Sequence, residues 1–189
     1  MRIKICGVTS TEDARLAEDA GADAVGIVVF SDSPRSVAVE CAGEILDALG
    51  PFTTGVCVTA TENAEEIDEI LSLSPAAVQV GADVSLPRTR ARVLRMVAPG
   101  EKTSHPCDAL VIDASRGKGR PFEREFARQV LESSSLPVVL AGGLSPENVG
   151  AAAALGPYAL DVASGVESRP GIKDPRLVRA FVSACRRHA

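Results

Sequence analysis

The sequence contains no tryptophan and a single tyrosine, so it lacks the aromatic side chains on which single-stranded nucleic acids stack. Basic residues are also in the minority, because 20 lysines and arginines stand against 25 acidic residues, which gives a net charge of −5. A protein whose main partner is nucleic acid usually has the opposite balance. We therefore expect no nucleic-acid partner.

Long apolar runs are missing as well. The longest covers residues 24–30 and contains a glycine, whereas a membrane-spanning helix needs about 20 apolar residues. The first residues have no apolar signal-peptide core behind them, so we expect no membrane association. Five cysteines without a Cys-x-x-Cys pair argue against a disulfide framework and for a reducing cytoplasm. The two histidines, His105 and His188, are far apart in the sequence, and we expect neither a metal nor a cofactor.

The length of 189 residues allows one well-buried core and is too short for two ordinary domains. No linker or low-complexity stretch divides the chain, so residues 1–189 are predicted to form a single domain. Short runs rich in valine and isoleucine alternate with longer helical patterns, which is typical of parallel βα units. The eight predicted strands are residues 3–6, 24–30, 54–58, 76–80, 93–98, 109–113, 137–141 and 159–163.

Capping signals precede four predicted helices. A serine, threonine, asparagine or aspartate before a helix accepts hydrogen bonds from its first backbone N–H groups, and proline favours the first helical position. The four signals are Thr9-Ser10-Thr11-Glu12 before a helix that runs to about Ala20, Asn63-Ala64-Glu65-Glu66, Ser145-Pro146 and Asp174-Pro175.

Two connections are short. Residues 86–90 leave room for about one helical turn, and residues 101–107 are too few for a normal helix. Eight βα units in this chain average about 24 residues each, well below the norm of roughly 250 residues for a whole (β/α)8 barrel. The predicted fold class is α/β: either a compact (β/α)8 TIM barrel with degenerate helices after strands four and five, or an open doubly wound sheet.

In both folds, ligands bind at the carboxyl ends of the strands. Gly142 and Gly143 follow the seventh predicted strand and lead toward a helix start, and Ser164 and Gly165 follow the eighth. Glycines let backbone N–H groups approach an anion, and a helix N-terminus adds a positive dipole. Either turn alone fits a simple tight turn. Together, after strands seven and eight, they predict a phosphate site.

Cys6 and Asp113 end the first and sixth predicted strands and are candidates for a catalytic base and acid. Alternate residues of a strand share a face, so Cys6 lies on the face of Lys4, whose positive charge would favour the thiolate. The alternative for Cys6 is a small buried apolar residue. The alternatives for Asp113 are a loop cap or an ion-pair partner of Lys4 or Arg95.

Two basic features follow strand ends. Arg35, in Ser33-Pro34-Arg35, could bind a carboxylate through two parallel hydrogen bonds or lie solvated at the surface. The loop Arg116-Gly117-Lys118-Gly119-Arg120 has neither dinucleotide-binding nor Walker spacing. It is suited to a lid over an anionic substrate, with a solvated loop as the alternative.

Several segments together resemble the phosphoribosylanthranilate isomerase family, the Amadori isomerases of the tryptophan pathway. They occur in the family's order between residue 4 and residue 174. The matching segments are Lys4-Ile5-Cys6-Gly7-Val8-Thr9, Glu12-Asp13-Ala14, Gly21-Ala22-Asp23-Ala24-Val25-Gly26, Ser33-Pro34-Arg35, Ala141-Gly142-Gly143-Leu144-Ser145-Pro146-Glu147-Asn148-Val149, Asp161-Val162-Ala163-Ser164-Gly165-Val166-Glu167, Pro170-Gly171 and Lys173-Asp174.

The resemblance implies a compact (β/α)8 TIM barrel that acts on a phosphorylated small molecule. The implied reaction is the rearrangement of N-(5-phosphoribosyl)anthranilate to 1-(2-carboxyphenylamino)-1-deoxyribulose 5-phosphate by general acid–base catalysis, without a cofactor. We expect a monomer or homodimer. The implied site residues are Cys6 as base, Asp113 as acid, Arg35 for the anthranilate carboxylate, Gly142, Gly143, Ser164 and Gly165 for the phosphate, and Asp161 as a further substrate-binding residue.

The sequence departs from the family pattern at four places. Gln79-Val80-Gly81-Ala82 lacks the histidine of the usual Gln-Leu-His-Gly, and Cys57-Val58-Thr59 replaces Phe-Val-Asn. The loop after Asp113 is shorter and is followed by Arg124 where a tryptophan is frequent, and Ala163 replaces a serine. None of these changes removes the expected acid, base or phosphate turns.

Three other functions are consistent with a phosphate-binding barrel. A Schiff-base aldolase needs a lysine at a strand end, but Lys4 is the only lysine within a predicted strand and lies below its end. The second is a non-catalytic paralogue that binds a sugar phosphate. The third is a related barrel isomerase that acts on a histidine-pathway aminoaldose.

Overall fold

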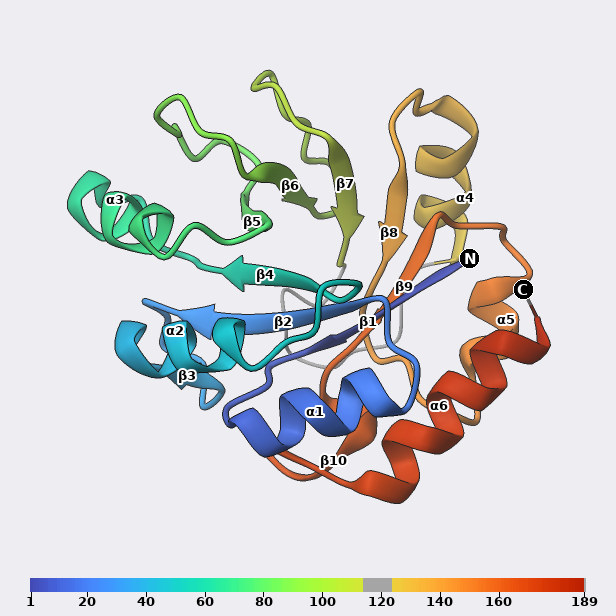
Figure 1. Cartoon of the computed structure of the whole chain (residues 1–189). Coiled ribbons are helices and arrows are strands. Elements are labelled where there is room, and N and C mark those ends of the chain that lie inside the picture. Colours follow the sequence, from blue (N-terminus) through green and yellow to red (C-terminus); the bar gives the residue numbers. More distant parts are fainter. Residues whose placement is uncertain (114–123, 189) are drawn as a thin grey trace.

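The computed structural model describes residues 1–113 and 124–188. Eight parallel strands form a closed ring in the order β1-β9-β8-β7-β6-β5-β4-β2, and β2 pairs with β1 to close it (Figure 1). The TIM barrel is thus confirmed over the open sheet, and each strand overlaps a predicted one. The strands are β1 Arg2–Cys6, β2 Ala24–Val29, β4 Thr54–Val58, β5 Ala77–Gly81, β6 Arg92–Val97, β7 Ala109–Ile112, β8 Val138–Leu140 and β9 Ala159–Val162.

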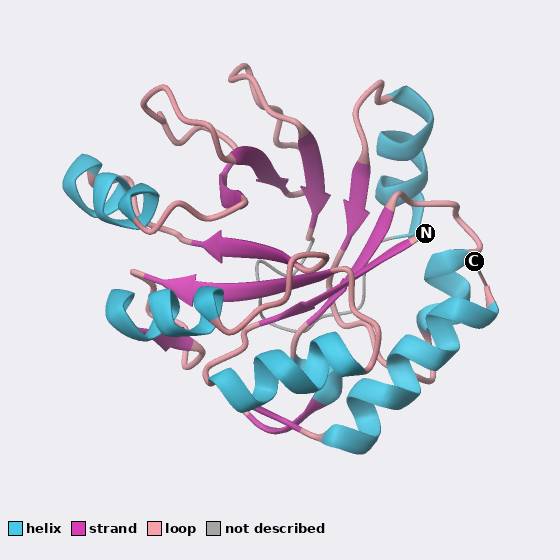
Figure 2. Cartoon of the chain, viewed as in Figure 1, coloured by secondary structure: helices cyan, strands magenta, loops and turns pink. Residues whose placement is uncertain are grey.

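Helices cover the outside of most of the ring (Figure 2). Their apolar faces and the outward residues of the strands form one buried cluster, which includes Ile5, Ile45 and Phe181. Within the described residues there are six α-helices and one short 3-10 helix. They are α1 Thr11–Asp19, α2 Val39–Asp47, α3 Ala64–Ser72, α4 Arg124–Ser133, α5 Val149–Ala153, α6 Pro175–Arg187 and η1 Ser164–Val166.

Three of the four predicted caps are confirmed. Ser10 caps α1, Asn63 caps α3 and Asp174 caps α6, each with a side-chain oxygen that accepts a hydrogen bond from a backbone N–H in the first turn. Pro175 is the first residue of α6, as predicted. At the fourth, Ser145, the structure differs, because helix α5 begins only at Val149.

The two short connections contain no helix, which confirms that this part of the barrel is degenerate. Residues 82–91 and 98–108 are loops, seen between α3 and α4 in Figure 2. Arg95 of β6 is only 2% exposed and links both loops. Its guanidinium donates hydrogen bonds to the carbonyl oxygens of Gly81 (3.1 Å), Ala82 (3.3 Å), Val84 (2.7 Å) and Pro106 (3.3 Å).

Three very short strands were not predicted. β3 (Ser36–Val37) extends the sheet beside β2. β10 (Glu167–Arg169) and β11 (Ile172–Lys173) form an antiparallel hairpin between β9 and α6. Strands of two or three residues are too short to show an alternating pattern in a sequence.

The barrel interior combines a small apolar cluster with three polar side chains. The apolar cluster contains Val111, Val139, Ala141 and Ala159, with Leu94 and Met96 packed against it. These three, Lys4, Gln79 and Asp161, are buried and joined by hydrogen bonds. The strand register pairs Lys4 with Asp161 across β1 and β9, and Cys6 with Gly26 across β1 and β2.

Candidate active site

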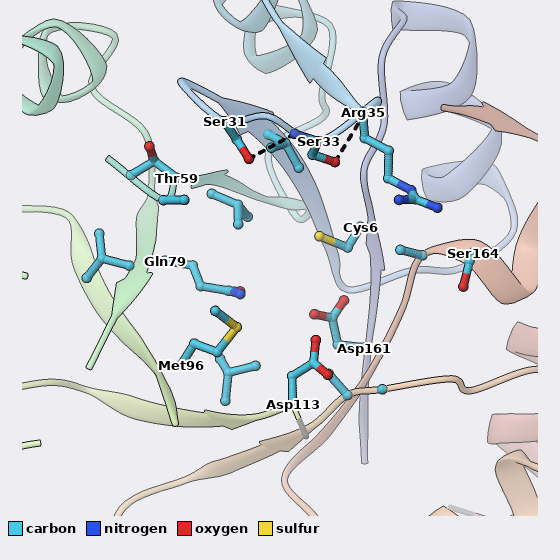
Figure 3. Close-up of a pocket in the computed structure, with 18 of the residues that line it drawn as sticks. Cys6, Ser31, Ser33, Arg35, Thr59, Gln79, Met96, Asp113, Asp161 and Ser164 are labelled. Atoms are coloured by element: carbon cyan, nitrogen blue, oxygen red, sulfur yellow. Dashed lines mark hydrogen bonds between the residues drawn. The ribbon is translucent and has the colours of Figure 1, made fainter. Parts of the chain in front are cut away.

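A cavity of about 520 Å³ opens where the barrel strands end. Figure 3 shows Cys6, Asp113 and Asp161 pointing into one open space, with Gln79 and Met96 on its other side. Seven of the eight predicted site residues line this cavity: Cys6, Arg35, Asp113, Gly142, Gly143, Asp161 and Ser164. The eighth, Gly165, is not among the lining residues.

The sulfur of Cys6 lies over Gly26 in the neighbouring strand. A Cβ at Gly26 would stand 2.7 Å from Sγ of Cys6 and 3.0 Å from Cε of Lys4, so the glycine leaves room for both side chains. Burial raises the pKa of the Cys6 thiol, and the nearby Lys4 ammonium opposes this effect. The expected influence of Lys4 is therefore present, but burial outweighs it and the thiol form is favoured.

Lys4 is the centre of a buried polar network. Its ammonium donates hydrogen bonds to Oδ2 of Asp161 at 2.8 Å and to Oε1 of Gln79 at 3.0 Å. Burial acts to lower the pKa of Lys4, but the charge of Asp161 opposes it and the pKa lies above its ordinary value, so Lys4 stays charged. The second oxygen of Asp161, Oδ1, is buried and has no hydrogen-bond partner among the described residues. It is an available acceptor in a residue that lines the cavity.

Asp113 directly follows β7 and is 8% exposed. Its carboxyl group points toward the space that Cys6 and Asp161 also face (Figure 3). The sequence offers Lys4 and Arg95 as ion-pair partners of Asp113. Their hydrogen bonds run to Asp161 and Gln79 and to main-chain carbonyl groups, respectively.

The turn after β8 differs from the prediction. Ser145-Pro146 does not start a helix, because α5 begins only at Val149 and has five residues. The side chain of Ser145 does accept from the N–H of Glu147, at 3.3 Å, but it does so in the turn that precedes the helix. The side chain of Asn148 also folds this turn: it accepts from the N–H of Ser145 and donates to the carbonyl of Gly143, both at 2.8 Å. The helix after this turn therefore begins three residues later than predicted. An anion bound here would accept hydrogen bonds from backbone N–H groups of the turn.

Glycine is required in both turns for two different reasons. Gly142 and Gly143 have φ values of +98° and +58°, a region that other residues adopt rarely. A Cβ on Gly165 would overlap the carbonyl oxygen of Leu144, so this glycine lets the turn after β9 touch the turn after β8. Gly165 thus acts through close approach of the two backbones, and Ser164 is the residue of its turn that lines the cavity.

Arg35 is not a solvated surface arginine, since its side chain is 13% exposed. It forms the predicted bidentate contact with a carboxylate, but this carboxylate belongs to Glu167 of the same chain. Nε and Nη2 donate to the two oxygens of Glu167 at 2.8 and 2.7 Å. Glu167 stands in a segment that carries the family resemblance, yet sequence reasoning assigned it no role.

Sequence reasoning also missed part of the cavity wall. Thr59, Gln79 and Met96 line it without having been assigned a role. The segment 31–34, which follows the end of the second predicted strand, also lines it. Gln79 had a usable signal, because it is a polar residue within an otherwise apolar predicted strand. Met96 had none, since a methionine in a strand most often reports a core position.

Two further expectations concern other parts of the chain. The basic loop Arg116-Gly117-Lys118-Gly119-Arg120 lies outside the described residues. Across residues 1–113 and 124–188, no group of three or more histidine, cysteine or acidic side chains could hold a metal ion. No helix in the same ranges has the length and apolar character needed to cross a membrane.

Comparison with known proteins gives consistent matches over the whole chain. The family model described as N-(5'phosphoribosyl)anthranilate (PRA) isomerase matches residues 3–184. A curated relative from Methanoregula boonei, N-(5'-phosphoribosyl)anthranilate isomerase, is 49% identical over 189 residues, which cover 98% of this chain and 97% of the relative.

Solved structures agree with this match. Phosphoribosyl anthranilate isomerase from Thermus thermophilus superposes with a TM-score of 0.88 at 35% identity, over 99% of both chains. A phosphoribosyl anthranilate isomerase in complex with reduced 1-(o-carboxyphenylamino)-1-deoxyribulose 5-phosphate superposes with a TM-score of 0.81 at 30% identity, over 98% of both. A monomeric form generated from the dimeric enzyme of Thermotoga maritima has a TM-score of 0.80 at 28% identity, again over 98% of both.

Proposed function

The chain belongs to the N-(5'-phosphoribosyl)anthranilate isomerase family, and we propose which of its side chains carry the reaction. The activity is the isomerisation of N-(5'-phosphoribosyl)anthranilate in tryptophan biosynthesis, EC 5.3.1.24. Cys6 is the general base and Asp113 the general acid. The observation that supports these roles is that both side chains line one cavity at the strand ends, beside the two glycine turns.

The proposed chemistry moves protons between two groups in opposite protonation states. Asp113 donates a proton to the ribose ring oxygen, and the C1′–O bond breaks to give an open-chain Schiff base. The thiolate of Cys6 then takes the proton from C2′, which leaves an enolamine. Tautomerisation of the enolamine gives the 2-keto product, and no atom is gained or lost.

The substrate is held at its two anionic ends. Backbone N–H groups around Gly142, Gly143 and Ser164 receive the phosphate, with Gly165 keeping the two turns together. Arg35 receives the anthranilate carboxylate. Because Glu167 uses Nε and one N–H of Nη2, the remaining N–H groups on Nη1 and Nη2 are the ones available to the substrate.

Asp161 contributes the acceptor between these two ends. Its Oδ1 is buried without a hydrogen-bond partner among the described residues, and a ribose hydroxyl group would satisfy it. Leaving a buried carboxylate oxygen unsatisfied is costly, so substrate binding gains from this contact.

We propose five further properties. Residues 1–189 form one domain, since the described strands make one closed ring. The chain is a monomer or a homodimer; the related enzyme of Thermotoga maritima is described as dimeric. Its place is the cytoplasm, which agrees with five cysteines that are all unpaired. It needs no metal or cofactor and has no nucleic-acid partner.

The direct test follows the fluorescence of the anthranilate group. Purified protein is mixed with freshly prepared phosphoribosylanthranilate, with Cys6→Ala in a parallel reaction. We expect rapid loss of fluorescence with the natural chain and almost none with the variant. Near-normal turnover of Cys6→Ala would show that another group takes the C2′ proton.

A further inference from the structure

The hairpin formed by β10 and β11 has no role in the reaction described so far. It crosses from the end of β9 to the segments that follow β1 and β2. Thr9 donates its hydroxyl to the carbonyl of Gly171 at 2.6 Å, and the N–H of Lys173 donates to Asp13 at 3.0 Å. A Cβ on Gly171 would stand 3.3 Å from the carbonyl oxygen of Pro34. The hairpin therefore touches the segments that carry Cys6 and Arg35.

Lys173 contacts the main chain of the proposed base. Its side chain is fully buried. The ammonium donates to the carbonyl of Cys6 at 2.6 Å, to Oε1 of Glu167 at 2.8 Å and to the carbonyl of Ala163 at 3.4 Å. Three acceptors match the three hydrogens of an ammonium group, so Lys173 ties the ends of β1 and β9 together.

Glu167 is the link between Lys173 and Arg35. Its side chain is 4% exposed, and its two carboxylate oxygens each accept a hydrogen bond from the Arg35 guanidinium. The stem of Arg35 crosses Gly7, where a Cβ would overlap Cδ of the arginine. The stem of Arg35 thus packs against the residue that directly follows Cys6. A continuous chain of contacts runs from Arg35 through Glu167 and Lys173 to the backbone of Cys6.

The charges of this cluster do not balance. Arg35 and Lys173 carry two positive charges and Glu167 one negative charge, so these three side chains together keep a net charge of about +1. The carboxylate of Asp13 accepts from the main-chain N–H of Lys173 and offsets part of this charge at the far side of the cluster from Arg35. A buried net positive charge is offset when an anion binds to it. The substrate has such an anion at the end away from its phosphate, the carboxylate of anthranilate.

We propose that Glu167 and Lys173 are positioning residues that present Arg35 to the substrate carboxylate and hold it in register with the main chain of Cys6. This inference rests on the proposed role of Arg35. Neither residue needs to touch the substrate. Glu167 fixes the plane of the guanidinium by a two-pronged contact, and Lys173 anchors Glu167 to the strand that carries the base.

The test measures what the substrate carboxylate contributes to binding. Two ligands are compared: reduced 1-(o-carboxyphenylamino)-1-deoxyribulose 5-phosphate and the same compound without its carboxyl group. In the natural chain we expect loss of the carboxyl group to weaken binding about tenfold, the size of one charge-assisted hydrogen bond. In Glu167→Gln we expect this factor to fall to about two or less, while the ligand without the carboxyl group binds as before. A purely structural role would weaken both ligands alike.

Two variants separate the inference from its premise. We call the ratio of the two ligands' dissociation constants the carboxylate factor. Arg35→Met should also reduce this factor to about one, and the double variant Arg35→Met/Glu167→Gln should bind the carboxylated ligand no more weakly than Arg35→Met alone. If Arg35→Met removes the factor but Glu167→Gln keeps it, the positioning role of Glu167 is wrong. If Arg35→Met itself keeps it, the proposed role of Arg35 fails, and the inference with it. Arg169→Gln, an exposed change in the same hairpin, is the matched control and should leave the factor unchanged.

Lys173 is tested by the charge it places near Cys6. The charge of Lys173 lowers the pKa of Cys6, so in Lys173→Met the increase of kcat/KM with pH should begin at a higher pH. Lys173→Arg keeps the charge and should have a pH profile close to that of the natural chain. The Arg variant also reports whether a cation at this position is sufficient for folding. A pH profile that is the same in both variants and in the natural chain would remove Lys173 from the positioning chain.

Discussion

The ammonium of Lys4 lies 2.8 Å from Oδ2 of Asp161, where β1 and β9 run side by side inside the barrel. The two side chains are 4% and 7% exposed, so this ion pair is shielded from water. It lies one step along the barrel interior from Cys6, on the same face of β1. A buried cation in this place controls how readily the thiol of Cys6 loses its proton.

Lys4→Met should therefore change the pH dependence of the reaction. Burial already raises the pKa of Cys6 above 9.0, and Lys4 lowers it while Asp161 raises it. Removing the cation and leaving the carboxylate raises the pKa further, so less thiolate is present at neutral pH. We expect kcat/KM at pH 7 to fall at least tenfold and its rise to begin at higher pH.

The measurement is the kcat/KM profile between pH 6 and 10, together with the alkylation rate of Cys6, obtained by subtracting the rate of Cys6→Ala. Lys102→Met makes the same change of charge at an exposed position and is the control. An unshifted profile in Lys4→Met would mean that Lys4 serves only to fill the barrel interior.

Asp113→Asn tests the acid. The amide keeps the shape of the carboxyl group but cannot donate its proton to the ring oxygen, so we expect kcat to fall by about 10²- to 10⁴-fold. KM should change only a few-fold, since the phosphate turns and Arg35 are untouched. Steady-state kinetics with the fluorescence assay measures both. A large rise in KM with little loss of kcat would make Asp113 a binding residue.

Gly143→Val tests the phosphate turn. The φ of +58° at Gly143 disfavours any side chain, and a distorted turn moves the backbone N–H groups that face the phosphate. We expect KM to rise at least tenfold while kcat at saturation changes less. Gly156→Val is the matched control, because Gly156 has a φ of +71° and open space around it but does not line the cavity. Equal effects of the two changes on KM would remove the turn from the site.

The strands could be predicted because their signal is local. Val- and Ile-rich runs mark strands that are buried on both faces, and all eight runs are strands. Helix α2 had no such signal, since Ala38 precedes it and makes no side-chain cap hydrogen bond. The ring closes because β1 pairs with both β2 and β9. This pairing joins segments far apart in the sequence, so no local pattern predicts it. The chain's resemblance to a family was needed to choose the barrel.

Of the site, the sequence predicts which residues stand at strand ends but not which distant side chains contact one another. Position at a strand end identified Cys6 and Asp113 as candidates for a catalytic base and acid, and the resemblance assigned the two roles. Contacts between distant residues could not be found in this way, because Arg35 and Glu167 are 132 positions apart and Lys4 and Asp161 are 157 apart. Each of these charged residues, taken alone, is also consistent with an ordinary solvated surface residue.

Glu167→Gln should change stability in a pH-dependent way. Burial acts to raise the pKa of Glu167, but hydrogen bonds from Arg35 and Lys173 outweigh it and hold the pKa below its ordinary value of 4.5. A carboxyl group with a depressed folded pKa stabilises the fold above its unfolded pKa and loses this effect as pH falls through the folded value. The variant should thus be less stable than the natural chain at pH 7, and the difference should shrink below pH 4.5.

Urea unfolding at pH 7 and at pH 3 measures this difference. Glu132→Gln, which changes an exposed glutamate paired with Arg128, is the control and should have little effect at either pH. If Glu167→Gln lowers stability by the same amount at both pH values, the loss comes from packing and not from the charge of Glu167.

Arg95 explains how a barrel of this length manages without two of its outer helices. A helix after β5 and another after β6 would cover the outer face of the sheet and satisfy their own backbone groups. Here one guanidinium binds four carbonyl oxygens of the two loops that replace them. Arg95→Met keeps most of the apolar stem but leaves these carbonyls without their donor, so we expect a loss of about 2 kcal/mol or more in the free energy of unfolding.

Chemical denaturation of Arg95→Met is compared with that of Arg92→Met. Arg92 stands in the same strand and pairs with Asp108, but its side chain is 76% exposed, so its removal should cost less than about 1 kcal/mol. Because the loops begin just after the cavity-lining residues Gln79 of β5 and Met96 of β6, Arg95→Met should also raise KM moderately. Equal stability of the two variants would mean that water satisfies the loop carbonyls as well as Arg95 does, and that the loops hold their shape without it.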